Sequence, residues 1–267
     1  MERELNQHHC RVLEQRGLCS DIWRMRLHAP ELVEQATAGQ FIHLRVDSRI
    51  APLLRRPFGI HRVDREKGEF EILYRVIGEG TALMTQIRVN DTVDILGPLG
   101  HGFDLAGDYT DAIVVAGGMG IAPVFFLIDE LLALEKKVSL FWGARLCEEI
   151  FVKPAQLKAR GVDLHLAVED GTLGHAGFVT DLLPTFLEQY GAEATFRGFA
   201  CGPNPMLNTL QRIVGEESSR WDVSLEAHMA CGVGVCMGCG VKDHQDGYRM
   251  VCSCGPVMNL KEVNLED

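Results

Sequence analysis

The C-terminal part of the chain carries cysteines whose number and spacing could bind a redox cluster. Cys231, Cys236 and Cys239 follow the pattern C-x4-C-x2-C, and Cys252 comes a short distance further on. Four thiolates at this spacing suit a [2Fe–2S] cluster, in which each tetrahedral iron takes two protein sulfurs. Glycines alternate with these cysteines and permit the tight turns and close N–H groups that such a loop needs. The pattern predicts a [2Fe–2S] cluster on Cys231, Cys236, Cys239 and Cys252.

The same cysteines could also form a zinc site, or they could be buried free thiols. Structural zinc usually takes paired C-x2-4-C knuckles, whereas only one such pair is present here. The spacing therefore favours the cluster, and the two alternatives stay open at this point.

Composition restricts the class of protein that could hold this site. The chain has 267 residues, a formal net charge of −11 and nine cysteines. Such a charge argues against a general nucleic-acid or anionic-membrane binder. The N-terminus has no apolar signal region, and the most apolar stretch, Ile113 to Leu134, is interrupted by glycine, proline and acidic residues. We expect a cytoplasmic protein whose length is sufficient for about two domains.

The rhythm of the sequence changes along the chain and predicts an α/β plus all-β fold. Residues 1–104 read as short alternating strands broken by turns, which favours an antiparallel β-barrel. Residues 105–220 alternate strands with helices, which favours a Rossmann-like nucleotide-binding domain. Residues 221–267 form a small C-terminal [2Fe–2S] segment with little regular structure. The expected elements are strands at 22–27, 41–46, 70–77, 92–96, 112–116, 138–142, 164–168 and 198–201, and helices at 123–136, 179–190 and 205–215.

A glycine-rich turn joins the first strand of the α/β region to its helix. Gly118, Met119, Gly120 and Pro123 lie in the sequence AGGMGIAP. Glycines let a backbone approach a pyrophosphate, and the free N–H groups of a helix N-terminus bind it. The match to G-x-G-x-x-G is imperfect, because Pro123 stands at the third glycine. Dinucleotide binding is one reading, and a turn that merely packs the helix on the sheet is the other.

The residue that follows the second strand of this region does not decide which dinucleotide binds. A Rossmann fold usually places an acidic residue there, but this chain has Arg145. Its guanidinium could reach a phosphate or a ribose, or it could be a solvated loop arginine. NAD and NADP therefore both remain open.

A third set of residues in the barrel region could hold a flavin. Arg56, Pro57, Phe58 and Gly59 are expected in a turn between strands, where arginine grips a diphosphate and phenylalanine offers a stacking face. The candidate set also includes the strand end Leu73, Tyr74 and Arg75, and the pair Gly80 and Thr81 at a short helix. Alone, this pattern is also compatible with an ordinary loop and a core phenylalanine.

Together the three motifs resemble a known family. RPFG at 56–59 and Gly80-Thr81 are similar to the flavin motifs of ferredoxin–NADP reductase-type proteins. The turn at 117–123 and Cys201-Gly202-Pro203 are similar to the pyridine nucleotide motifs of the same superfamily. Four further segments most resemble one branch, the electron-transfer subunit of the NAD-linked, type B dihydroorotate dehydrogenases. They are DGTLG at 170–174, GFVTDL at 177–182, MACGVGVCMGC at 229–239 and VCSCGPV at 251–257.

The resemblance implies the cofactors and the partner. FAD is expected on residues 56–59, 73–75, Gly80 and Thr81, NAD on the glycine turn with Arg145 and Gly202, and the cluster on the four cysteines. It also implies an FMN-containing catalytic subunit that oxidises dihydroorotate to orotate in pyrimidine biosynthesis, in a heterotetramer with two copies of each subunit. Nicotinamide exchanges two electrons, a cluster exchanges one, and a flavin can do both. Electrons are therefore expected to pass from the partner through the cluster and FAD to NAD+.

The chain departs from the family pattern at two positions. Gly59 stands where the family usually has Ser or Thr, so a hydroxyl contact to the flavin is absent. Cys254 stands where the branch commonly has Asp, and on chemistry alone it could be the fourth ligand in place of Cys252. The position in the motif favours Cys252.

Three further residues near these motifs have open roles. Cys201 lies near the nicotinamide by resemblance, or is an ordinary buried thiol at a strand end. Glu226 and His228 precede the cysteines and are expected to be solvated surface residues, although a role in proton movement or partner contact is open.

Two different functions remain as alternatives. The same module could serve a hydrogenase or a ferredoxin-dependent NADP reductase, although one such reductase has Asp as its first cluster ligand and this chain has Cys231. A redox sensor that turns nothing over is the second alternative.

Overall fold

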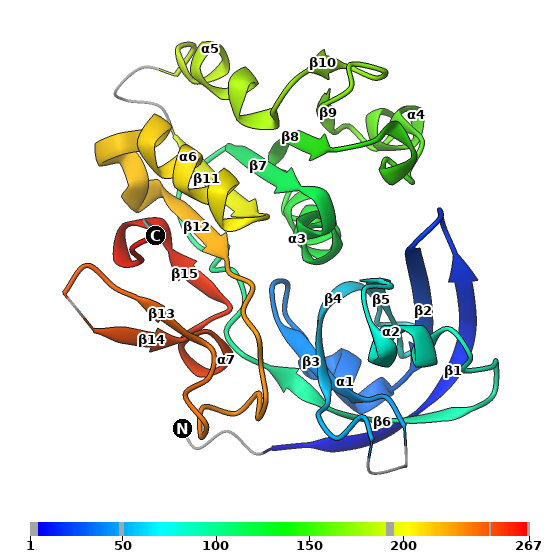
Figure 1. Ribbon diagram of the computed structural model, residues 1–267. Coiled ribbons are helices and arrows are strands. Elements are labelled where there is room, and N and C mark those ends of the chain that lie inside the picture. Colours follow the sequence, from blue (N-terminus) through cyan, green and yellow to red (C-terminus); the bar gives the residue numbers. More distant parts are fainter. Residues whose placement is uncertain (1–4, 48–50, 191–194, 246, 266–267) are drawn as a thin grey trace.

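The computed structural model describes residues 5–47, 51–190, 195–245 and 247–265, which form a barrel, a sheet flanked by helices and a C-terminal segment (Figure 1). The barrel strands are antiparallel and close in the order β1-β2-β5-β4-β3-β6. This confirms the predicted barrel. Its strands are β1 (Gln7–Gly17), β2 (Ile22–His28), β3 (Phe41–Arg45), β4 (Arg56–Asp64), β5 (Glu69–Arg75) and β6 (Thr92–Leu99), with helices α1 (Pro30–Gln35) and α2 (Glu79–Met84).

Strand β3 faces two different cores. Successive side chains of a strand point to opposite faces. Ile42 and Leu44 therefore point into the barrel core, whereas Phe41 belongs to a second core with Cys239 and Cys252. The C-terminal segment thus packs on the outside of β3.

The second unit is a seven-stranded sheet in the order β10-β9-β8-β7-β11-β12-β15. All neighbouring pairs are parallel except β12 with β15. Its strands are β7 (Asp111–Gly117), β8 (Lys137–Ala144), β9 (Asp163–Val168), β10 (His175–Ala176), β11 (Phe196–Cys201), β12 (Trp221–Ser224) and β15 (Val257–Asn259). The helices are α3 (Ile121–Ala133), α4 (Pro154–Ala159), α5 (Leu183–Leu187) and α6 (Asn204–Val214).

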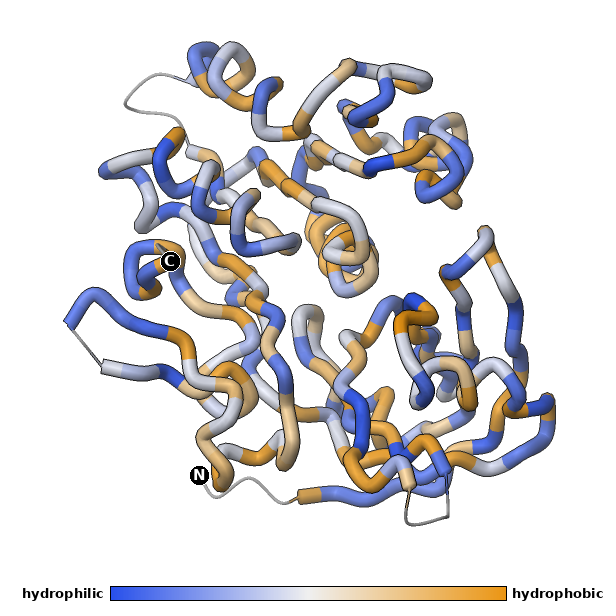
Figure 2. The backbone as a smooth tube through the Cα atoms, viewed as in Figure 1, coloured by the Kyte–Doolittle hydropathy of each residue, from blue (hydrophilic) through white to orange (hydrophobic). Residues whose placement is uncertain are grey.

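The apolar run of β7 is explained by burial on both faces, as parallel strands require. Val114 and Ala116 share a core with the apolar side chains of α3, and Ile113 and Val115 share the other core with Leu207 of α6. Figure 2 shows the hydrophobic α3 lying against this strand. The Rossmann-like arrangement that the sequence predicts is therefore present.

Two local expectations were wrong. The helix expected at 179–190 is a 3-10 turn at Val179–Leu182 followed by the short α5, because Pro184 in the first turn of α5 has no N–H to continue a longer helix. The C-terminal segment has more regular structure than expected. It supplies β12 and β15 to the sheet and also contains β13 (Gly240–Lys242), β14 (Tyr248–Met250) and α7 (Val251–Cys254).

The C-terminal segment leaves the sheet and returns to it at adjacent points. β15 pairs antiparallel with β12, and the Leu225 N–H donates to the Pro256 carbonyl oxygen at 2.9 Å. The predicted domain divisions at 104 and 220 stay predictions. In the part of the chain that the structure describes, no helix has the length and apolar character to span a membrane.

Candidate functional site

The flavin-motif residues lie on a strand and not in a turn, which corrects the expectation for Arg56, Pro57, Phe58 and Gly59. They open β4, where they pair with β3 only, since pairing with β5 starts at Ile60. A strand paired on one side tolerates proline, because its missing N–H interrupts no ladder there. Phe58 packs near Tyr74, with ring centroids 5.8 Å apart.

Arg56 reaches from β4 to the start of α2. An ideal Cβ on Gly80 would lie 2.9 Å from Arg56 Nε, so only glycine lets the guanidinium lie this close to the backbone. The Thr81 hydroxyl is occupied by its own turn, because it accepts from the N–H groups of Ile77 and Gly78 and donates to the Gly78 carbonyl oxygen. Thr81 therefore shapes the loop that presents Gly80.

Residues 73–75 complete the barrel side of the site. Leu73 and Tyr74 are buried, and the Tyr74 hydroxyl accepts a hydrogen bond of 2.7 Å from Gln15. Arg75 pairs with Glu149, which follows β8, at 2.5 Å and with Asp21 at 3.2 Å. The Arg75 side chain therefore links the barrel to the sheet.

The glycine turn packs its helix on the sheet and also leaves backbone open to a ligand, so both readings of the sequence are compatible with it. Gly120 packs the start of α3 on β11, because a Cβ there would lie 2.1 Å from the Cys201 carbonyl oxygen. Gly118 has a φ of +53° and its Cβ position faces open space. Pro123 lies in the first turn of α3. The turn therefore packs the helix and also presents open backbone to the site.

The ends of the neighbouring parallel strands bring Arg145, Cys201 and Gly202 to the same edge of the sheet. Arg145 is exposed, and its backbone N–H donates to Glu149 at 3.0 Å. The Cys201 thiol is buried, and burial together with the nearby Glu226 charge strongly raises its pKa. The thiol is therefore protonated at neutral pH.

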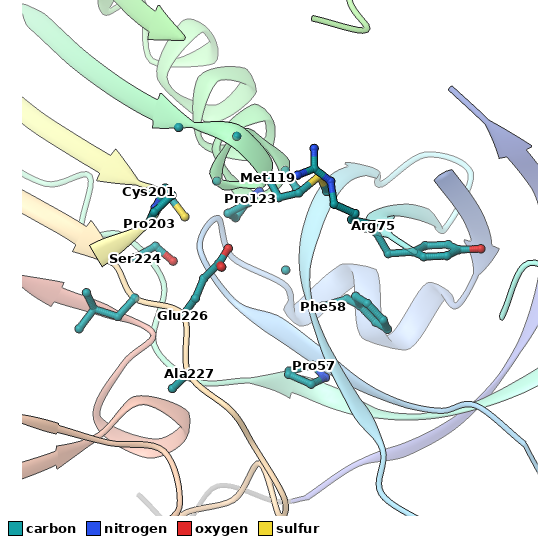
Figure 3. A pocket seen from close by; sticks show the side chains of 18 of the residues that line it. Pro57, Phe58, Arg75, Met119, Pro123, Cys201, Pro203, Ser224, Glu226 and Ala227 are labelled. Carbon is teal, nitrogen blue, oxygen red and sulfur yellow. The ribbon is translucent and has the colours of Figure 1, made fainter. Parts of the chain in front are cut away.

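One cavity of about 1490 Å³ connects these residues. All fifteen residues predicted to bind FAD or NAD line it, as does Cys201. Its lining also includes Met229, Ala230 and Gly238, which belong to the cysteine segment. Figure 3 shows Phe58 and Arg75 on the barrel side and Cys201, Ser224 and Glu226 on the sheet side. The cavity therefore joins all three motifs.

Glu226 and His228 are both exposed, in agreement with the expectation of solvated residues, and both line this open cavity. Figure 3 shows the Glu226 carboxylate pointing into it. The cavity walls partly desolvate this exposed carboxylate, which raises the pKa of Glu226 above its ordinary 4.5. Sequence reasoning also missed Ser224 and Thr180, which line the cavity. Glu226 lies two residues after the end of β12, a strand that was not among the expected elements, so the sequence carried no local signal for its place in the cavity.

The four predicted cluster cysteines form two pairs. Sγ of Cys239 lies 3.2 Å from Sγ of Cys252, and both residues are buried. The Cys231 sulfur accepts from the Cys236 N–H at 3.4 Å, and the Cys252 sulfur accepts from the Gly234 N–H at 3.0 Å. Gly232 and Gly234 have φ of +71° and +84°, the left-handed region that such a loop needs. Cys254 is exposed.

The electrostatics of the two cysteine pairs differ. Burial raises the pKa of Cys231, but N–H groups of Val233 and Cys236 that donate to its sulfur lower it to about 6 overall. Burial and the neighbouring Cys239 raise the pKa of Cys252 to about 12. Bound iron supplies the charge that keeps such a thiol deprotonated.

The pairing fits a two-iron cluster better than a single zinc ion. A structural zinc site gathers four ligands around one point. Two thiol pairs, by contrast, supply two sulfurs for each iron of a [2Fe–2S] cluster.

Comparison with known families follows the same three-part order. Residues 9–103 match the oxidoreductase FAD-binding domain, and residues 114–212 match the oxidoreductase NAD-binding domain. Residues 226–264 match the iron–sulfur cluster binding domain of dihydroorotate dehydrogenase B. These matches confirm the predicted FAD, NAD and iron–sulfur cofactors.

Curated relatives match almost the whole chain. The dihydroorotate dehydrogenase B (NAD(+)) electron transfer subunit of Desulforamulus reducens is 36% identical over 255 residues, covering 92% of this chain and 94% of that protein. The subunit of the same name from Bacillus cereus strain B4264 is 36% identical over 260 residues, covering 95% and 97%.

Solved structures share the fold. The NADH-dependent reduced ferredoxin–NADP oxidoreductase has a TM-score of 0.83 at 25% identity and covers 96% of this chain and 90% of that one. A ferredoxin NADP+ reductase from Neisseria gonorrhoeae has a TM-score of 0.66 at 20% identity, covering 78% and 90%.

The fold and the site together define an oxidoreductase of the ferredoxin–NADP reductase type, in which an iron–sulfur domain follows the FAD- and NAD-binding domains. Within this class, the chain belongs to the family of the dihydroorotate dehydrogenase B (NAD+) electron transfer subunit.

Proposed function

We propose that this chain carries electrons from an FMN-containing partner, which oxidises dihydroorotate to orotate in pyrimidine biosynthesis, to NAD+. The family to which the chain belongs supports this function. The observation that carries it is the single cavity that runs from the flavin strand past the nucleotide turn to the cysteine segment. A heterotetramer with two copies of each subunit is part of the proposal.

Each cofactor has a set of residues that fits it. FAD is held by residues 56–59, 73–75, Gly80 and Thr81, and NAD by the turn at 118–123 with Arg145 and Gly202. The cluster is held by Cys231, Cys236, Cys239 and Cys252. The 3.2 Å contact between the Cys239 and Cys252 sulfurs and the exposure of Cys254 support Cys252 as the fourth ligand.

When bound, FAD supplies the exchange between the two-electron chemistry of nicotinamide and the one-electron chemistry of the cluster. The chain's own groups orient these carriers and manage protons. The glycine turn presents open backbone for a pyrophosphate. Glu226 lies at the cavity wall and has a raised pKa. It therefore holds a proton more readily than a carboxylate of ordinary pKa.

The cysteine segment offers an apolar face to a partner. Val235 and Met237, beside the exposed Cys236, are 80% and 66% exposed, and Tyr248 on β14 is 63% exposed. Exposed apolar groups next to a redox centre suit a protein interface. Val235→Asp should therefore reduce co-purification with the dihydroorotate-oxidising subunit, whereas Leu134→Asp, at an exposed leucine after α3, should not.

The decisive experiment uses anaerobically purified chain, alone and co-expressed with that subunit. Alone, it should show flavin absorbance, and NADH should produce the EPR signal of a reduced [2Fe–2S] cluster. Together, the two subunits should reduce NAD+ with dihydroorotate. A cluster that NADH cannot reduce rules out the electron-transfer role. A chain that is reduced by NADH but supports no dihydroorotate oxidation serves another partner, such as a hydrogenase or ferredoxin.

A further inference from the structure

His43 is a buried histidine between the flavin strand and the cysteine segment. On β3 it pairs in register with Pro57 of the flavin motif. Like Phe41, two residues before it, it points away from the barrel core that holds Ile42 and Leu44. On the outer face of β3, Phe41 belongs to the same buried core as Cys239 and Cys252. One strand therefore supports the flavin motif at its edge and the cysteine segment on its face.

The imidazole lies directly against the cysteine loop. An ideal Cβ on Gly232 would lie 2.5 Å from His43 Nδ1, so the loop backbone passes the ring at a distance that only glycine permits. The backbones of Cys231 and Arg55 also interact with the ring. The ring thus lies between Cys231, a predicted cluster ligand, and the residue that precedes the flavin motif.

The polar atoms of this ring have only loose partners for so buried a group. The residue is 1% exposed, yet neither Nδ1 nor Nε2 makes a hydrogen bond of standard geometry to the described part of the chain. A buried polar group left without a well-aligned partner destabilises the folded state. An imidazole ring carries at least one N–H that can donate a hydrogen bond.

We propose that His43 is a positioning residue for the iron–sulfur site: its N–H donates a hydrogen bond to the backbone of the Cys231 loop, holds that loop on β3 and thereby raises the reduction potential of the cluster. Hydrogen bonds around cluster sulfurs are among the factors that set the potential. Groups that orient metal ligands also tune a site, and their loss typically costs about 10–100-fold in metal affinity or activity. This inference rests on the proposed function, since it needs a bound cluster.

The test compares His43→Leu with His43→Asn, because the Asn amide can replace a donor at the place of Nδ1. The readout is an EPR-monitored redox titration of holoprotein. At the wild-type midpoint potential, His43→Leu should lower the ratio of reduced to oxidised cluster about tenfold. This corresponds to a fall of about 59 mV in the midpoint potential of a one-electron couple. His43→Asn should recover most of this loss. The flavin midpoint should stay unchanged in both variants.

The matched control is His61→Asn. His61 is another buried barrel histidine, but its Nδ1 contacts the Ala122 carbonyl oxygen at 2.7 Å and its ring packs on Phe125. Its loss should leave the cluster potential unchanged. Equal cluster potentials in wild type and His43→Leu at full iron content overturn the proposal.

A second measurement remains decisive if His43→Leu does not fold. Wild-type protein labelled with 15N only in histidine should show a weak nitrogen coupling to the reduced cluster, and this coupling should disappear in His43→Asn. An absent coupling in the wild type overturns the assignment of His43. An absent cluster in wild-type protein overturns the proposed function instead, so the two failures are distinguishable.

Discussion

At the scale of single residues, Gly59 shows how the flavin strand is fitted to the nucleotide helix. A Cβ at this position would lie 3.1 Å from Pro123 Cβ, closer than ordinary van der Waals contact. The Pro123 ring is rigid and sits in the first turn of α3. A side chain at 59 therefore needs β4 and α3 to move apart, and glycine removes that need.

We predict that Gly59→Ser and Gly59→Ala both lower the free energy of unfolding by about 1 kcal/mol, the low end of the cost of overpacking. Urea denaturation of holoprotein measures this. The Ala variant separates the steric effect from the hydroxyl, because it adds the same Cβ alone. Unchanged stability in Gly59→Ala would contradict a steric role for this glycine.

The two neighbouring cysteines 252 and 254 should differ sharply in their effect. Cys252 is buried against Cys239, whereas Cys254 is exposed. Cys252→Ser should lose the cluster, and Cys254→Ser should keep about two iron atoms per chain with an unchanged EPR signal. Iron analysis and EPR on anaerobic protein decide this. The reverse result would move the fourth ligand to Cys254.

At the scale of elements, a glycine that packs a helix on the sheet differs from a glycine with free space around it. Gly120 has no room for a Cβ because of the Cys201 carbonyl oxygen, whereas nothing lies within 4 Å of the Cβ position of Gly78 before α2. Gly120→Ala should therefore displace α3 from β11 and weaken NADH binding at least tenfold. Gly78→Ala, the control, should leave it near wild type. Titration of NADH binding by flavin fluorescence measures both.

The elements that could be predicted from the sequence are those with a clear local pattern. The unbroken apolar run of β7 and the glycine turn after it were sufficient to predict the NAD-binding domain, and cysteine spacing was sufficient to predict the iron–sulfur domain. β4 was missed because Arg56-Pro57 resembles a turn, and only its one-sided pairing with β3 shows why proline is tolerated. The position of Glu226 could not be predicted, because the cavity wall is built from segments distant in sequence.

At the scale of the whole molecule, the barrel and the sheet share one hydrophobic core, and polar contacts beside the cavity add to it. His61 Nδ1 lies 2.7 Å from the Ala122 carbonyl oxygen, and Arg75 pairs with Glu149. Ser20, in the turn between β1 and β2, donates to Glu148 at 3.3 Å. These contacts fix the flavin side of the cavity relative to the nucleotide side.

Acid should weaken this interface. Complete burial lowers the pKa of His61 from 6.5 to about 3, so in this range the unfolded state binds a proton that the folded state does not. The resulting stability is fully present above pH 6.5 and is lost as the pH falls toward 3. For one proton the slope is at most about 1.4 kcal/mol per pH unit.

Thermal unfolding at pH 7.5, 6 and 5 tests this prediction. The wild-type Tm should fall with acid, and His61→Asn should start lower but fall less steeply. His9→Asn removes an exposed histidine of β1 and should follow the wild type. Parallel pH profiles of wild type and His61→Asn would show that another group causes the acid sensitivity.

The return of the C-terminal segment to the sheet has a consequence for how this molecule could be divided. Because β12 and β15 are adjacent and Leu225 bonds to Pro256, residues 226–255 form an insertion closed at its neck. A short turn joining the two strands would leave the barrel and the sheet continuous. The shortened chain would be a diaphorase that oxidises NADH with a two-electron dye. Without the cluster it could not transfer single electrons to or from a protein partner.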